Sequence, residues 1–300
     1  MVFPLWEKQV DISAQISGKK DLFENHLHAY LETADASSGI FEAFSYSLRS
    51  GGKRIRPVLA MMACESLGGN APETLPAGLA IEMIHTFSLI HDDLPALDND
   101  DMRRGRPTCH AKFGEATAIL AGDALIFQAL SVIGDSGYPL RVKLDILTFM
   151  AEACGVRGLV QGEYQDVMAE GKSLSIQDIG DIYRKKTSRL FELCMFAGSR
   201  IAGGATEQID ALVGFGTYLG LAFQAIDDIL DVTSSGDVLG KTSGKDIIQD
   251  KATIVKAVGL ENARRWAGEM TEKAVAHLHA GVTNPLPLKE FAFSMLERVM

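Results

Sequence analysis

Acidic residues gather at two points of the chain, each at the end of an apolar stretch. The first group is HDDLPALD at 91–98, and the second is FQAIDDILD at 223–231. Carboxylates among apolar neighbours need a cation, because burying an unpaired charge costs a large free energy. Oxygen ligands suit Mg²⁺, which usually completes its coordination shell with water and substrate phosphates. The two groups therefore predict a magnesium site that acts on a phosphorylated substrate.

The spacing within each group indicates which carboxylates share a face. Asp227 and Asp231 are four residues apart, so a helix places them on the same side. Asp92 and Asp98 are six residues apart, and Pro95 between them cannot donate a helical hydrogen bond. We therefore expect a local bulge that returns Asp98 to the face of Asp92. The alternative is solvated charge at two helix ends, which the repetition of the pattern makes less favoured.

Basic residues accompany both acidic groups. GGKRIRP at 51–57 predicts a loop that opens a helix, where glycines allow close approach and the helix N-terminus favours anions. Lys53 and Arg56 are three residues apart and can point the same way. The other candidates are Arg103, Arg104, Lys185, Lys186, Lys241, Lys245 and Lys251. We favour a diphosphate that Mg²⁺ bridges to the carboxylates and that these cations also bind. The alternative is internal salt bridging.

Composition and charge exclude several classes of protein. With 47% hydrophobic and 23% charged residues, the chain has the proportions of a globular protein. A net charge of −10 argues against a general nucleic-acid binder. Four widely spaced cysteines favour reduced thiols in a cytoplasmic protein over disulfides or a zinc site. We find neither a signal peptide nor a run of 18 uncharged apolar residues, so we expect no membrane span.

Helical periodicity dominates the chain, and strand signals are scarce. The predicted helical segments are 21–34, 40–50, 54–67, 74–93, 114–133, 140–168, 175–202, 205–231 and 249–280. Two stretches, 114–133 and 212–230, are apolar on most faces, which is typical of helices inside a large bundle. The sequence therefore predicts a single all-α domain over residues 1–300.

Together these motifs resemble the trans-isoprenyl diphosphate synthases, most closely the bacterial farnesyl diphosphate synthases. The resemblance runs from about residue 20 to the C-terminus. Its landmarks are GGKRIRP at 51–57, IHTFSLIHDDLPALDNDDMRRGRPTCH at 84–110, KKT at 185–187, FQAIDDILD at 223–231 and GKTSGKD at 240–246. It implies one polyprenyl synthetase domain, an isoprenoid-synthase-type helical bundle around a central cavity, usually as a homodimer. The implied reaction joins isopentenyl diphosphate to dimethylallyl and geranyl diphosphate, giving farnesyl diphosphate.

The resemblance also implies roles for individual residues. Asp92 and Asp98 would hold two Mg²⁺ ions and Asp227 a third, with Asp228 and Asp231 helping through water. The allylic diphosphate would bind Arg103, Lys186 and Lys241, and isopentenyl diphosphate would bind Lys53, Arg56, His85 and Arg104. Thr187 and Gln224 would lie near the developing carbocation and complete the catalytic set with Lys186, Asp92 and Asp227. For His85, the alternative is a hydrogen-bonded core histidine.

Phe87 and Ser88 are expected to determine product length. They lie five and four residues before Asp92, which is roughly 6–8 Å along a helix at 1.5 Å per residue. An aromatic ring there can form a floor beneath the growing chain, and the matching family pattern goes with a fifteen-carbon product. The alternative is that Phe87 serves only core packing.

Three positions depart from the family pattern. Glu163 replaces a usual glutamine, the C-terminal end lacks a basic tail, and Ile254 replaces a frequent aromatic residue. The competing hypotheses are a geranylgeranyl diphosphate synthase, a metal phosphohydrolase built on His91 and Asp92, and a catalytically silent partner subunit.

Overall fold

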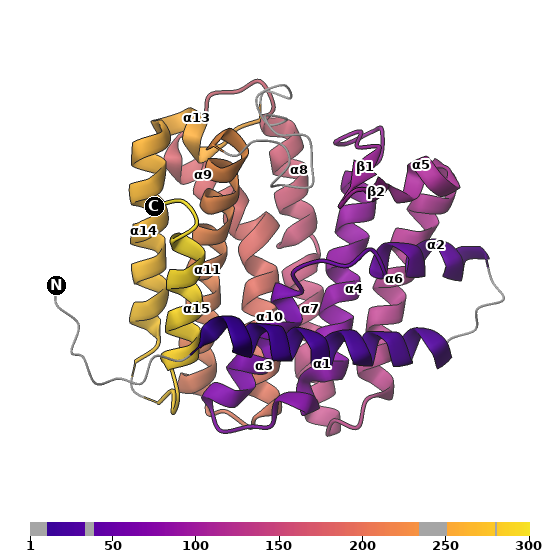
Figure 1. The fold of residues 1–300 in the computed structure, drawn as a ribbon, viewed down its shortest axis with the longest axis vertical. Helices are drawn as coiled ribbons and strands as arrows, with labels where there is room; N and C mark the ends of the chain where they lie inside the picture. The colour runs from indigo at the N-terminus through magenta and orange to yellow at the C-terminus, as the bar shows by residue number, and fades with distance from the viewer. Residues whose placement is uncertain (1–10, 34–38, 234–250, 280) are drawn as a thin grey trace.

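The computed structural model describes residues 11–33, 39–233, 251–279 and 281–300. Long helices stand side by side in a bundle, and α1 runs across one end of it (Figure 1). In chain order the helices are α1 Ile12–Thr33, α2 Gly39–Leu48, α3 Ile55–Ser66, α4 Leu75–Asp92, α5 Cys109–Phe113, α6 Glu115–Asp135, α7 Leu140–Cys154, α8 Leu159–Ala169, α9 Ile176–Tyr183, α10 Arg189–Ile201, α11 Thr206–Thr233, α13 Ile254–Val258, α14 Leu260–His277 and α15 Leu286–Leu296. A 3₁₀ turn, η1 Ala71–Thr74, precedes α4, and a π-helical turn, η2 Arg184–Ser188, joins α9 to α10. The all-α prediction is confirmed.

The core forms around α3, α4, α10 and α11, whose side chains are apolar on most faces. α10 packs against α3 and α11, α4 packs against α6, and α14 covers α11. Phe23, Phe191 and Phe215 are fully buried there. Burying one such side chain stabilises the fold by about 1.5–3 kcal/mol. Burial of the apolar helix faces is therefore what holds the helices of the bundle together. The hairpin after α4 and the short helix α13 lie at the same end of this bundle (Figure 1).

Two predicted helices are each divided in two. The segment 140–168 breaks between α7 and α8, where a Cβ atom at Gly158 would lie 1.9 Å from the carbonyl oxygen of Ala153. The segment 249–280 breaks at Gly259, whose φ of 79° is left-handed. Helical spacing of apolar residues continues across a single glycine, so periodicity alone does not reveal such a break.

A short hairpin, absent from the predicted elements, follows α4. β1 Met102–Arg103 pairs antiparallel with β2 Arg106–Pro107, and Arg103 lies opposite Arg106. The two turn residues, Arg104 and Gly105, have φ of 53° and 72°. A two-residue hairpin loop favours positive φ at both positions, and here an Arg–Gly pair supplies it in place of the usual Asn–Gly.

Two helices, α6 and α11, are long and apolar enough to cross a membrane by length and composition alone. Neither holds 18 consecutive uncharged residues, because Asp123 divides α6 and the uncharged part of α11 is 211–226, so the expectation of no membrane span stays a prediction. The apolar window of α11 is 56% buried inside the bundle, which is typical of a core helix. The apolar window of α6 is only 33% buried. α6 therefore keeps an apolar face that the described residues leave uncovered.

Candidate active site

The first acidic group lies where α4 ends. Asp92 is the last helical residue, and the chain then turns back so that the N–H of Asp98 donates to the carbonyl oxygen of Asp92 at 2.8 Å. The turn around Pro95 thus returns Asp98 to the end of the helix that carries Asp92. Burial raises the pKa of Asp92, and Asp98 adds to this effect, whereas Lys186 opposes it.

Asp93, the neighbour of Asp92, binds an arginine from the hairpin. Nε of Arg103 donates to the two carboxylate oxygens of Asp93 at 2.8 and 3.0 Å, and its Nη2 lies 2.6 Å from Oδ1. This forked geometry orients the guanidinium strongly. Burial lowers the pKa of Arg103, but Asp93 and, to a smaller extent, the charge of Asp92 raise it above its usual value. Arg103 is therefore held close to the first acidic group, as its predicted role requires.

The second acidic group lies in the last two turns of α11. Asp227 and Asp231 are half-buried, and Oδ2 of Asp231 is enclosed without a hydrogen-bond partner within the described residues. Asp228 is buried and differs from both. Its carboxylate accepts hydrogen bonds from the Tyr183 hydroxyl, from the Ile254 N–H at 3.1 Å and from Gln224 Nε2 at 3.1 Å. Asp228 therefore joins α11 to α9 and α13, rather than only assisting an ion through water.

The π-helical turn η2 carries Lys186 and Thr187. Nζ of Lys186 lies 2.8 Å from Glu163 and 2.6 Å from Asp166, both on α8. Burial lowers the pKa of Lys186, but Asp166, Asp92 and Glu163 together raise it well above its usual value. The Thr187 hydroxyl donates to Oε1 of Gln224 at 2.8 Å. The predicted catalytic groups from η2 and α11 therefore meet.

Close packing between α8 and η2 makes this arrangement possible. A Cβ atom at Gly162 would lie 2.2 Å from the backbone nitrogen of Lys186, so only glycine allows the approach. A π-helical turn within α-helical surroundings is frequent at functional sites. Here it presents Lys186 to the carboxylates of α8 and Thr187 to α11.

A second basic group forms around the loop that precedes α3. The guanidinium of Arg104 donates to the carbonyl of Gly51 and lies so close to Gly52 that a Cβ atom there would be 2.7 Å from Nη1. Burial, followed by the charge of Arg56 and Arg104, lowers the pKa of His85 well below its usual value. His85 is therefore neutral at pH 7 and can act only as a neutral hydrogen-bonding group.

Arg56 belongs to the same group. Its guanidinium stacks over the ring of Phe191 with 5.5 Å between Cζ and the ring centroid. Its Nε is buried without a hydrogen-bond partner in the part of the chain that the structure describes. Burial lowers the pKa of both Lys53 and Arg56, while the charge of Asp227 opposes this effect at both residues. The charge of the second acidic group thus acts on the second basic group.

Lys251, one of the candidate cations, contacts the first acidic group, and Arg298, to which no role was assigned, acts on Lys53. Lys251 binds Asp98 through both carboxylate oxygens, at 2.9 and 3.1 Å. Arg298 adds to the lowering of the pKa of Lys53, after the larger effect of burial. The position of Lys251 after the second acidic motif indicated that it could reach the site. No sequence pattern indicated the same for Arg298. Lys241 and Lys245 lie outside the described residues.

Phe87 and Ser88 lie on α4 below the first acidic group. Phe87 is 6% exposed, and its ring meets that of His91 edge to face at 5.7 Å. The Ser88 hydroxyl donates to the carbonyl of His85 at 3.0 Å. Nε2 of His91 lies 3.1 Å from the carbonyl oxygen of Ile119 on α6. His91 therefore packs and hydrogen-bonds between helices, which disfavours the phosphohydrolase hypothesis.

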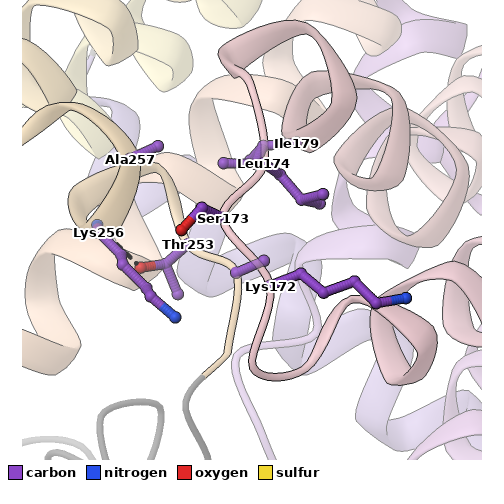
Figure 2. Close-up of a pocket in the computed structure, with 8 residues that line it drawn as sticks. Lys172, Ser173, Leu174, Ile179, Thr253, Lys256 and Ala257 are labelled. Atoms are coloured by element: carbon purple, nitrogen blue, oxygen red, sulfur yellow. Dashed lines mark hydrogen bonds between the residues drawn. The ribbon is translucent and has the colours of Figure 1, made fainter.

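Two cavities lie beside these groups. One of about 140 Å³ opens where the loop between α8 and α9 meets α13, with Lys172 and Lys256 on opposite sides of it (Figure 2). The other, of about 30 Å³, lies among α2, α4 and the hairpin and is lined partly by Asp93 and Arg103. Neither is lined by both acidic groups, so the central cavity remains a prediction.

Comparison with known proteins decides the family. The polyprenyl synthetase family model matches residues 38–280. This chain belongs to that family. A farnesyl diphosphate synthase of Geobacillus stearothermophilus is 41% identical over 273 residues, covering 90% of this chain and 92% of that protein. The large subunit 1 of a heterodimeric chloroplastic geranylgeranyl pyrophosphate synthase of Arabidopsis thaliana is 47% identical over 245 residues, covering 78% of this chain and 65% of that protein.

Solved structures agree with the family match. A geranyltransferase from Helicobacter pylori, complexed with magnesium and isoprenyl diphosphate, aligns with a TM-score of 0.81 at 28% identity, over 97% of this chain and 98% of that one. The predicted family, the isoprenoid-synthase type of fold and the prenyltransferase class are therefore confirmed. The roles of individual residues remain predictions that the geometry supports.

Glu163 provides a test of the electrostatics on α8. Burial, followed by the charge of Asp92, raises its pKa from 4.5 to about 7. Between these values the folded protein holds a proton that the unfolded chain releases, so stability falls as pH rises. We expect the unfolding free energy of the metal-free wild type to fall, relative to Glu163→Gln, by about 2–3 kcal/mol between about pH 5 and pH 8.

Denaturant titration at each pH measures this difference. Glu170→Gln changes an exposed glutamate just beyond α8 and serves as the control. It should follow the wild-type profile. Parallel profiles for wild type and Glu163→Gln would contradict the assignment.

Proposed function

We propose that this prenyltransferase condenses isopentenyl diphosphate with dimethylallyl diphosphate and then with geranyl diphosphate to form (2E,6E)-farnesyl diphosphate in the cytoplasm. The observation that carries the proposal is the division of the cations into two groups. Arg103, Lys186 and Lys251 gather beside the first acidic group. Lys53, Arg56 and Arg104 gather around the loop before α3. Two diphosphates need two such subsites.

The acidic groups fit Mg²⁺ by the chemistry of their ligands. They offer carboxylate oxygens, and the enclosed Oδ2 of Asp231 has no partner within the described ranges. In the same ranges, no three His, Cys, Asp or Glu side chains converge as a preformed metal site. Diphosphate oxygens and water would therefore complete the shell, which is usual for Mg²⁺. We propose that Asp92, Asp98, Asp227 and Asp231 hold the metal, as three ions.

Bound Mg²⁺ would neutralise the diphosphate leaving group and so favour breaking of the allylic carbon–oxygen bond. Arg103 and Lys186 bind the same diphosphate and add fixed positive charge where negative charge develops. The Thr187 hydroxyl and Gln224 amide present oxygen dipoles to the carbocation. Lys53, Arg56 and Arg104 hold isopentenyl diphosphate so that its double bond attacks that carbon. The released diphosphate takes the proton, so the protein needs no dedicated base.

Purified protein with Mg²⁺, isopentenyl diphosphate and dimethylallyl diphosphate tests the proposal. We expect a fifteen-carbon product, and we expect Asp227→Asn to lower kcat at least about 10²-fold. Asp210→Asn, which changes an exposed aspartate on the same helix α11, should leave kcat unchanged. A protein that forms no prenyl product alone would instead be a silent subunit, and phosphate release from nucleotides would favour a phosphohydrolase.

Product length should depend on Phe87, which is buried five residues before Asp92 on α4. Phe87→Ala removes the ring that we propose as the floor, so products should shift to twenty carbons or more. Chromatography of the dephosphorylated products measures this shift. Phe41→Ala removes a similarly buried ring from α2 and should keep the fifteen-carbon product. An unchanged profile for Phe87→Ala would leave Phe87 as core packing only.

We further propose that the protein is a homodimer that covers the apolar face of α6. Ile119, Leu120, Phe127 and Leu130 are 44%, 58%, 69% and 37% exposed on this helix. Their spacing places them on one side, and a monomer would leave this side in water.

Sedimentation equilibrium tests the dimer. It should give a mass of twice the chain mass of 32.4 kDa, and Phe127→Glu should lower the measured mass to that of the monomer. Phe293→Glu on α15, which is 37% exposed, should remain dimeric.

A further inference from the structure

Arg54 stands between two cations of the second basic group, but its own side chain points into the protein. Its Nε donates to Glu24 of α1 at 2.8 Å, its Nη1 to Glu82 of α4 at 2.8 Å, and its Nη2 to the carbonyl of Leu48 at the end of α2 at 2.6 Å. The side chain is 1% exposed. One guanidinium therefore joins three helices beneath the loop. Its positive charge is paired with the carboxylates of Glu24 and Glu82.

The backbone of Arg54 is left-handed, with φ 51° and ψ 36°. This conformation is unfavourable for a residue other than glycine, so the surrounding contacts must maintain it. The bend separates the loop residue Lys53 from the first turn of α3, which carries Arg56. The charge of Asp227 acts on both of these cations, on either side of the bend.

Glu82 connects this anchor to the rest of the second basic group. It is 2% exposed on α4 and lies three residues before His85. Its negative charge acts on Arg54, Arg56 and Arg104 alike. Three guanidinium groups would otherwise repel one another in a poorly solvated place. The carboxylate of Glu82 therefore allows the cations to stay close together before any diphosphate binds.

We propose that Arg54 and Glu82 are positioning residues for the subsite that binds isopentenyl diphosphate. They touch no substrate, and they act by holding Lys53, Arg56 and Arg104 in place. The allylic subsite is built on different contacts, those of Lys186 with α8 and of Arg103 with Asp93. A change at Arg54 or Glu82 should therefore affect one substrate and spare the other. This inference rests on the proposed function.

Two variants that keep the charge test the inference. Arg54→Lys removes the forked contacts, and Glu82→Asp withdraws the carboxylate by one methylene, so each alters position without altering net charge. In the reaction of isopentenyl diphosphate with geranyl diphosphate, we expect each variant to raise KM for isopentenyl diphosphate by about tenfold. We expect KM for geranyl diphosphate to change by less than about twofold.

Lys19→Ala is the matched control. It breaks the ion pair of 2.8 Å between Lys19 of α1 and Glu65 of α3, a link between helices at the end of α3 away from this loop. Both KM values should stay at the wild-type level. Thermal unfolding confirms that each variant is folded, and if Arg54→Lys fails to fold, Glu82→Asp decides by the same comparison.

The outcomes separate the two claims. Product formation by the wild type supports the proposed function whatever the variants do. Equal increases in both KM values, or no increase in either, would overturn the positioning role while leaving the function intact. If the wild type forms no prenyl product, the proposed function fails, and the positioning role for this substrate fails with it.

Discussion

Pairing between carboxylates and cations inside an apolar bundle is the interaction on which this site depends. An isolated charge in such surroundings is costly, so a partner of opposite sign stabilises a buried charged group. Arg103 binds Asp93, Lys251 binds Asp98, and Lys186 binds Glu163 and Asp166. The same contacts that stabilise the fold therefore hold reactive groups in place. A magnesium diphosphate carries both signs of charge and can exchange partners with these groups without leaving either sign uncompensated.

Packing sets the distances over which this pairing works. Gly162 lets α8 approach η2 closely enough for both of its carboxylates to reach Lys186. Asp228 has a related structural role, because its bonds to Tyr183 and Ile254 connect the second acidic group to α13. The end of α13 that these bonds fix also carries the chain towards Lys251 and hence to the first acidic group. The two acidic groups thus share one framework, although about 135 residues separate them in the chain.

Relatives of this chain include synthases named for both farnesyl and geranylgeranyl products, and the identity of 47% to one of the latter exceeds the 41% to one of the former. Overall identity therefore does not decide product length. The charged residues that we propose as catalytic would serve both reactions equally, because both ionise an allylic diphosphate. Length is a local steric property, and a buried aromatic ring below Asp92 is the kind of residue that can set it.

The sequence alone determined what depends on near neighbours. Apolar spacing predicted most of the helices, and the four-residue step from Asp227 to Asp231 and the proline between Asp92 and Asp98 predicted how each acidic group folds locally. Tertiary structure decided what depends on distant partners: the contact of Lys251 with Asp98, 153 residues away, and the inward turn of Arg54 towards Glu24 and Glu82. The physical reason is that periodicity and turn chemistry are properties of consecutive residues. Whether a cation meets substrate or a buried carboxylate depends instead on which helices pack together.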